Sequence, residues 1–80
     1  RKIDISKYDA IILDGDHTDE GLRRDLKYVL KNNSKCIIFV DDTDHKHIRN
    51  QIDKLRSNEK YKNLNVNYEY NNQLAIITRN

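Results

Sequence analysis

The sequence predicts an α/β fold in which a mostly parallel sheet ends in an antiparallel hairpin. Two short apolar runs rich in β-branched residues are each followed by a stretch whose apolar residues recur at helical spacing. A strictly alternating run and a last apolar run then follow each other closely, which is typical of a hairpin. Strands and helices that alternate along a chain indicate strand–helix–strand units with right-handed crossovers.

The first two strands are expected at residues 8–13, which read Y-D-A-I-I-L, and at residues 36–40, which read C-I-I-F-V. Neither run alternates regularly between apolar and polar residues. Continuous apolar runs of this kind are typical of parallel strands covered on both faces, so we expect both strands to be buried on both sides.

A helix is expected between these strands, because four apolar residues there share one helical face. Thr18 can cap its N-terminus, with Asp19 and Glu20 in the first turn, where the helix dipole favours acidic side chains. The apolar residues are Leu22, Leu26, Val29 and Leu30.

A second helix is expected after the second strand and should run to about Asn58. Its apolar residues stand at positions i, i+4 and i+7, and Thr43 or Asp44 is available to cap it. They are Ile48, Ile52 and Leu55. The polar stretch 58–63 should connect this helix to the hairpin.

The last part of the chain predicts a hairpin near the edge of the sheet. Residues 64–70 alternate between apolar and polar, as in a strand with one face in water. Asn71 and Asn72 offer a tight turn, because asparagine tolerates positive φ. Residues 74–78 read L-A-I-I-T and predict a buried last strand.

Length and charge narrow the function classes. A chain of 80 residues is a single domain at most, residues 1–80, with a modest core. Because it begins at Arg1 and its apolar runs look too buried for so short a chain, we expect it to be the C-terminal half of a larger domain.

The net charge of +2 gives no case for nucleic-acid binding, and the scattered basic residues are expected on solvated helix faces. These are Arg23, Arg24, Lys27, Lys31, Lys54 and Arg56.

The compartment is expected to be the cytoplasm. Cys36 is the only cysteine and lies inside an apolar run, so we expect a buried thiol in a reducing environment. No apolar stretch approaches the roughly 20 residues that a membrane span needs, so no membrane partner is expected.

Candidate functional residues follow the first two strands directly. Asp14-Gly15-Asp16-His17 comes after the first strand and Asp41-Asp42-Thr43-Asp44-His45 after the second. Ligands of open parallel sheets bind beyond the carboxyl ends of the strands, so we expect Asp14, Asp41 and Asp42 to converge on one cation. Oxygen ligands fit Mg²⁺ or Mn²⁺ better than Zn²⁺. The alternative is that the polar residues only cap helices and shape loops: Asp16, Thr18, Thr43 and Asp44.

The histidines differ in what they can do. His17 stands beside the acids and is a candidate for proton transfer, because imidazole exchanges protons near neutral pH. His45 and His47 lie on or near a helix start, and metal binding by them is not favoured.

These motifs carry a resemblance to a known family. Residues 8–17 (Y-D-A-I-I-L-D-G-D-H), then Gly21 and Arg24-Asp25-Leu26 on a helix, and residues 37–42 (I-I-F-V-D-D) together resemble class I S-adenosylmethionine-dependent methyltransferases. More narrowly, the chain resembles the small-molecule O-methyltransferases with a D-G-D-H motif. The resemblance spans nearly the whole chain. It implies the fourth to seventh strands of a Rossmann-like sheet, with the last strand antiparallel between its two predecessors.

The resemblance implies methyl transfer from S-adenosylmethionine to a hydroxyl of a small molecule, with sugars among the acceptors, and Mg²⁺ as an optional helper. A cation beside the hydroxyl would favour its deprotonation, and the oxygen would then attack the methyl group in line. The implied site residues are Asp14, Gly15 and Asp16 for the cofactor, Asp14, Asp41 and Asp42 for the metal, and His17 as the general base. The implied partners are the small-molecule substrate and the N-terminal half of the same domain, and a homo-oligomer is left open.

The chain departs from the family pattern in several places. Residues 32–35, N-N-S-K, replace the usual Pro-Gly-Gly turn. Asp19 stands where an aromatic residue often follows the histidine, and Asp41 stands where metal-dependent members often have Glu. The glycine-rich cofactor loop and the acidic ribose-binding residue are both missing from the sequence. We therefore expect this chain alone to be inactive and to bind the cofactor poorly or not at all.

Two other functions are compatible with the motifs. Residues 14–18 also fit the D-x-D-x-T motif of haloacid-dehalogenase-like phosphatases, with Asp14 as nucleophile and Asp16 as acid/base. One helix leaves too little chain for the motifs that this family places before its distal acidic pair, which argues against it. The other alternative is a non-catalytic structural or dimerising domain whose acids are solvated.

Overall fold

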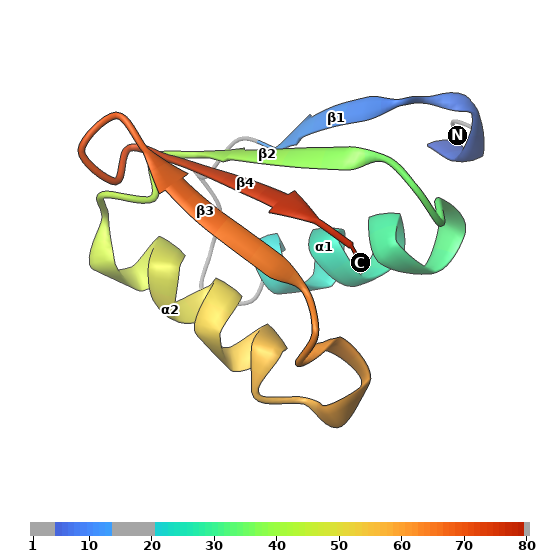
Figure 1. Cartoon of the computed structure of the whole chain (residues 1–80). Helices are drawn as coiled ribbons and strands as arrows, with labels where there is room; N and C mark the ends of the chain where they lie inside the picture. The colour runs from blue at the N-terminus through green and yellow to red at the C-terminus, as the bar shows by residue number, and fades with distance from the viewer. Residues whose placement is uncertain (1–4, 14–20, 80) are drawn as a thin grey trace.

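The chain forms a four-stranded sheet with two α-helices on one face (Figure 1). This computed structural model describes residues 5–13 and 21–79. The strands are β1 (Ala10–Leu13), β2 (Ile37–Asp41), β3 (Asn65–Glu69) and β4 (Leu74–Thr78). The α-helices are α1 (Gly21–Asn32) and α2 (Lys46–Arg56), and the 3-10 helices are η1 (Ile5–Lys7) and η2 (Glu59–Tyr61). The α/β prediction is confirmed.

The sheet is mixed, with strand order β1-β2-β4-β3. β1 pairs with β2 in parallel, whereas β4 is antiparallel to both of its neighbours, β2 and β3. β1, β2 and β3 therefore run in one direction, but β4 separates β3 from the other two. The prediction of a mostly parallel sheet is therefore confirmed only in part: the fold is α/β, but its sheet is mixed. The last strand does lie antiparallel between its two predecessors, as expected.

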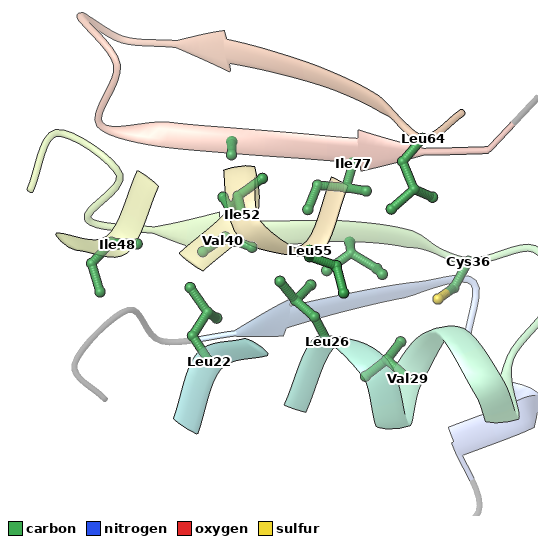
Figure 2. Packing of buried hydrophobic residues seen from close by; sticks show 12 residues of the cluster. Leu22, Leu26, Val29, Cys36, Val40, Ile48, Ile52, Leu55, Leu64 and Ile77 are labelled. Atoms are coloured by element: carbon green, nitrogen blue, oxygen red, sulfur yellow. The ribbon is translucent and has the colours of Figure 1, made fainter. Parts of the chain in front are cut away.

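The core lies between the sheet and the two helices, and Figure 2 shows its side chains. Because side chains alternate along a strand, every second residue of β2 and β4 points toward the helices. The predicted apolar faces of both helices are buried against them, except that Leu30 is only partly buried. The buried apolar residues are Leu22, Leu26, Val29, Cys36, Ile38, Val40, Ile48, Ile52, Leu55, Leu64, Ala75 and Ile77. Cys36 is a free, buried cysteine as predicted, and burial raises the pKa of its thiol.

The end of α1 is tied to the start of the described chain by Asn33, which is 2% exposed. Its Nδ2 donates hydrogen bonds to the carbonyls of Ile5 (2.7 Å) and Tyr8 (2.8 Å). Its Oδ1 accepts hydrogen bonds from the backbone N–H groups of Lys35 (3.0 Å) and Cys36 (2.9 Å). One side chain therefore fixes both the turn into β2 and the segment that leads into β1.

The end of α2 differs from the prediction. The helix ends at Arg56 rather than near Asn58. Asn58 instead caps η2, because its Oδ1 accepts a hydrogen bond from the N–H of Lys60 at 2.9 Å. A polar residue after a helical run can cap the next helix as well as extend the previous one, and here local side-chain bonding decides.

The predicted hairpin and its asparagine turn are both confirmed. β3 lies at one edge of the sheet, and its side chains alternate between exposed and half-buried. Tyr70, Asn71 and Asn72 all have positive φ, of 56°, 56° and 68°. The N–H of Gln73 donates to the carbonyl of Tyr70 at 3.1 Å and closes the turn. The turn thus runs from Tyr70 to Gln73, two residues more than the two asparagines.

The second face of the sheet, here called the open face, has no helix on it in the described ranges (Figure 1). Ile12 is 75% exposed and Ile37 is 40% exposed. The expectation that the first two strands are buried on both faces is therefore wrong for the described chain, because burial alternates along β1 and β2. Ile12, Phe39 and Ile76 stand opposite one another across three strands. The β3 side of the open face is polar: Asn65, Asn67 and Glu69.

Candidate functional site

The carboxyl ends of β1 and β2 lie side by side, as expected of neighbouring parallel strands, whereas the expected convergence of Asp14 with Asp41 and Asp42 involves a residue outside the described ranges. Leu13, the last residue of β1, pairs with Val40, and Asp41 ends β2 one residue later. The first predicted site segment, Asp14-Gly15-Asp16-His17, and the predicted cap Thr18 lie outside the described residues. The site is therefore built from the loop that follows β2.

The loop from Asp41 to His45 turns sharply out of the sheet. Asp42 has a φ of 63°, in the left-handed region that aspartate enters more readily than most residues. Its N–H donates to Oδ1 of Asp41 at 2.8 Å, and its carbonyl accepts a hydrogen bond from the N–H of His45 at 3.0 Å. The turn presents the side chains of the loop beyond the end of β2, immediately before α2.

Thr43 anchors this loop to the β3–β4 hairpin. It has no exposed surface, and its Oγ1 donates to the carbonyl of Asn72 at 2.6 Å. Its N–H donates to the carbonyl of Gln73 at 3.3 Å. Thr43 is therefore not the cap of α2, and neither is Asp44. The N-cap is His45, which makes no side-chain capping hydrogen bond.

Three side chains of the loop could hold a cation together: Asp42, Asp44 and His45. Each offers one ligand atom, and these atoms all lie within 4.8 Å of one another. Two ligands of one Mg²⁺, each at about 2.1 Å, stand at most about 4.2 Å apart. Asp42 is half-buried, whereas Asp44 and His45 are exposed. Binding of one ion would therefore require side-chain rotations that bring the three atoms closer together.

The group differs in part from the predicted ligands Asp14, Asp41 and Asp42. Asp42 belongs to it, whereas Asp41 is exposed, lies outside it, and accepts the hydrogen bond from Asp42. The sequence predicts Asp44 only as a cap or loop residue and does not favour His45 as a ligand. The D-x-D-H spacing of residues 42–45 before a helix is the sequence signal that points to them.

The electrostatics of the loop stabilise its acids with or without a cation. Asp42 and Asp44 precede the N-terminus of α2, where the helix dipole favours negative charge by about 0.3–1 kcal/mol. His45 also packs edge-on against His47, with ring centroids 6.1 Å apart and an angle of 80° between the planes. The arrangement offers two carboxylates and one imidazole to an ion or a substrate beside the end of the sheet.

Comparisons with known proteins leave the function to be argued from this geometry. No family model matches the chain, and no match is found among curated proteins or solved structures. No helix within residues 5–13 and 21–79 has the length and apolar character needed to cross a membrane.

Proposed function

We propose that the chain is part of a methyltransferase that moves a methyl group from S-adenosylmethionine to a hydroxyl of a small molecule, with sugars among the acceptors. The observation that carries the proposal is the parallel pairing of β1 and β2, whose carboxyl ends open beside the loop 41–45. The strand order β1-β2-β4-β3 supports it as well. Asp14, Gly15 and Asp16 as cofactor contacts and His17 as the general base belong to the same proposal, on the strength of the D-G-D-H motif.

A divalent cation is the second part of the proposal. Asp42 and Asp44 offer the oxygen ligands that Mg²⁺ and Mn²⁺ prefer, and the imidazole of His45 favours Mn²⁺ over Mg²⁺. Asp14 and Asp41 are the further ligands suggested by the sequence. A bound cation would favour deprotonation of the substrate hydroxyl.

The proposed partner within the same protein is an N-terminal half that completes the sheet. The outer edge of β1 has no pairing strand in the described chain. The open face beside it carries a row of three apolar side chains: Ile12, Phe39 and Ile76. Apolar side chains of a neighbouring unit would cover this row and so remove it from water. The polar β3 side of the same face suits contact with water. A reducing compartment, the cytoplasm, fits the free Cys36.

Binding of S-adenosylmethionine to the full-length protein, measured by calorimetry, tests the first part. We expect binding, together with transfer of labelled methyl to one member of a panel of hydroxyl acceptors. Hydrolysis of an aryl phosphate without cofactor binding would instead favour the phosphatase alternative. If neither cofactor binding nor phosphate hydrolysis occurs, a non-catalytic domain explains the chain better.

Asp42→Asn tests the cation. Removal of a ligand carboxylate should lower Mn²⁺-dependent activity at least about tenfold. Asp53→Asn is the matched control, because Asp53 is an exposed aspartate of α2 outside the ligand group and its loss should leave activity unchanged. Activity that persists in the presence of a chelator would contradict the metal part and leave the methyltransferase part standing.

A further inference from the structure

A hollow lies at the opposite end of the sheet from the loop 41–45, which we call the acidic loop, and we call this hollow the basic hollow. It has a volume of about 300 Å³, and its lining residues are Lys60, Tyr61, Asn63, Leu64 and Arg79. An overlapping hollow of about 230 Å³ extends it to Leu30 in the last turn of α1. Asp41 pairs with Leu74 at the start of β4, whereas Arg79 follows the end of that strand. The length of β4 therefore separates the basic hollow from the proposed methyl-transfer site.

The charge of the basic hollow is unbalanced. Lys60 and Arg79 both line it, and no carboxylate among residues 5–13 and 21–79 does. The acid nearest in sequence, Glu59, is engaged by Lys62, with Nζ and Oε1 2.9 Å apart. In the described part of the chain neither Lys60 nor Arg79 forms an ion pair. Within those residues, two cations therefore face one cavity without an anionic side chain between them.

Arg79 is held in place by the end of α1. Its Nη2 donates a hydrogen bond to the carbonyl of Leu30 at 3.0 Å, and the residue is half-buried. The guanidinium keeps other N–H donors available, since it has five in a rigid plane. The carbonyl oxygen of Leu30, which would otherwise repel an anion, accepts this hydrogen bond from Arg79. The carbonyl oxygen of Tyr28 likewise accepts a hydrogen bond from Asn32 Nδ2 at 2.8 Å. The negative end of the helix is therefore partly shielded from the basic hollow.

Apart from polar Asn63, the rest of the lining is aromatic or aliphatic. Tyr61 is half-buried, and Leu64 is 8% exposed. Lys60 Nζ lies 5.6 Å from the centroid of the Tyr61 ring, within the range of a cation–π contact. An aromatic wall next to two cations matches a ligand that has a ring at one end and an anionic group at the other.

We propose that the basic hollow binds a small aromatic oxyanion, in which a phosphate-like or carboxylate group lies between Lys60 and Arg79 and a ring lies against Tyr61 and Leu64. Lysine and arginine bind such groups through charge-assisted hydrogen bonds. A volume of about 300 Å³ is at the small end of ligand pockets and matches one ring with one anionic group. This binding is independent of the proposed methyl transfer.

Titration of the intact protein with phenylphosphonate, followed by amide chemical shifts at constant ionic strength, tests the proposal. We expect shifts centred on residues 60–64 and 79, and affinity about fivefold higher than for inorganic phosphate, because the ring adds apolar contact. Benzoate should bind at the same place and neutral benzamide should not. Lys60→Gln should weaken phenylphosphonate binding about fivefold.

Lys54→Gln is the matched control, because Lys54 is an exposed lysine of α2 that does not line the basic hollow. It should leave the affinity unchanged, whereas loss of Lys62 would release Glu59 beside Lys60. Equal weakening by Lys60→Gln and Lys54→Gln would show diffuse attraction to a positive surface and overturn the proposal. An absence of shifts at residues 60–64 would overturn it too. Lys60 is exposed and its substitution removes only the charge at the hollow, whereas Arg79→Gln also removes the bond to Leu30.

Discussion

Hydrogen bonds accepted by the Asn33 side chain hold the turn between α1 and β2, where proline and glycine could instead have favoured a turn through their backbone conformation. The methyltransferases that the sequence resembles usually have a Pro-Gly-Gly turn at this point, and the sequence alone shows the Asn-Asn-Ser-Lys stretch only as a departure from that pattern. In the structure Asn33 uses both of its amide hydrogens and accepts two hydrogen bonds with its oxygen. Sequence reasoning could not find this role, because the two carbonyls lie 28 and 25 residues away.

Asn33→Ala should lower the free energy of unfolding by about 2–4 kcal/mol, because it leaves two carbonyls and two N–H groups without their partners. Urea denaturation followed by circular dichroism measures the loss. Asn32→Ala is the control, since exposed Asn32 makes one hydrogen bond to the carbonyl of Tyr28 and should cost about 0.5 kcal/mol. Equal effects of the two substitutions would argue that the Asn33 bonds do not form in solution.

The candidate metal ligands also could not be fully predicted from the sequence. The apolar run 36–40 places Asp41 directly after the second strand, and in the structure Asp41 is the last residue of β2. Which acids point toward one another depends on the φ of Asp42 and on the anchoring of Thr43, neither of which has a sequence pattern of its own. That is why Asp44 and His45 join the group while Asp41 does not.

The elements themselves were predictable, and their ends less so. Helical spacing of apolar residues located the apolar faces of α1 and α2, and alternation located β3. Strand β4 has the predicted bounds. Helix ends depend on bonds that compete with the helix, as at Asn58, or on long-range contacts that remove a capping candidate, as at Thr43.

The hairpin turn gives a prediction at this scale. Tyr70 is 74% exposed and has a φ of 56°, a conformation that costs a residue with a Cβ about 1 kcal/mol. Tyr70→Gly should therefore be more stable than Tyr70→Ala by about 1 kcal/mol in thermal or urea unfolding. The usual order, with alanine more stable than glycine, would mean that the turn adopts another conformation in solution.

The molecule as a whole is a two-layer α/β structure with one layer of helices. The sequence predicts strands that are covered on both faces, because their apolar runs are continuous. Such runs show that a strand is apolar, but they do not show whether both of its faces are covered. The core side of the prediction is confirmed at Ile38 and Val40, which are 1% and 0% exposed. The other side, from Ile12 to Ile76, is the part that the described residues leave open.

The open face should bind the dye ANS in the folded 80-residue chain, because apolar side chains stay accessible there. Ile12→Thr should reduce ANS fluorescence and change the free energy of unfolding by no more than about 0.5 kcal/mol. Ile38→Thr, on the buried face of the neighbouring strand, should cost about 2–4 kcal/mol. If Ile12→Thr were equally costly, the open face would be covered in solution, for instance by a second copy of the chain.

The bond between Thr43 and Asn72 ties the acidic loop to the turn of the β3–β4 hairpin. The acceptor is a main-chain oxygen, so the joint tolerates exchange of the side chain at position 72. It requires a hydroxyl at position 43 and a backbone at Asn72 that keeps its left-handed turn. The position of the Asp42 and Asp44 carboxylates therefore depends on the β3–β4 hairpin, although the hairpin itself has no need to contact the ion or the substrate.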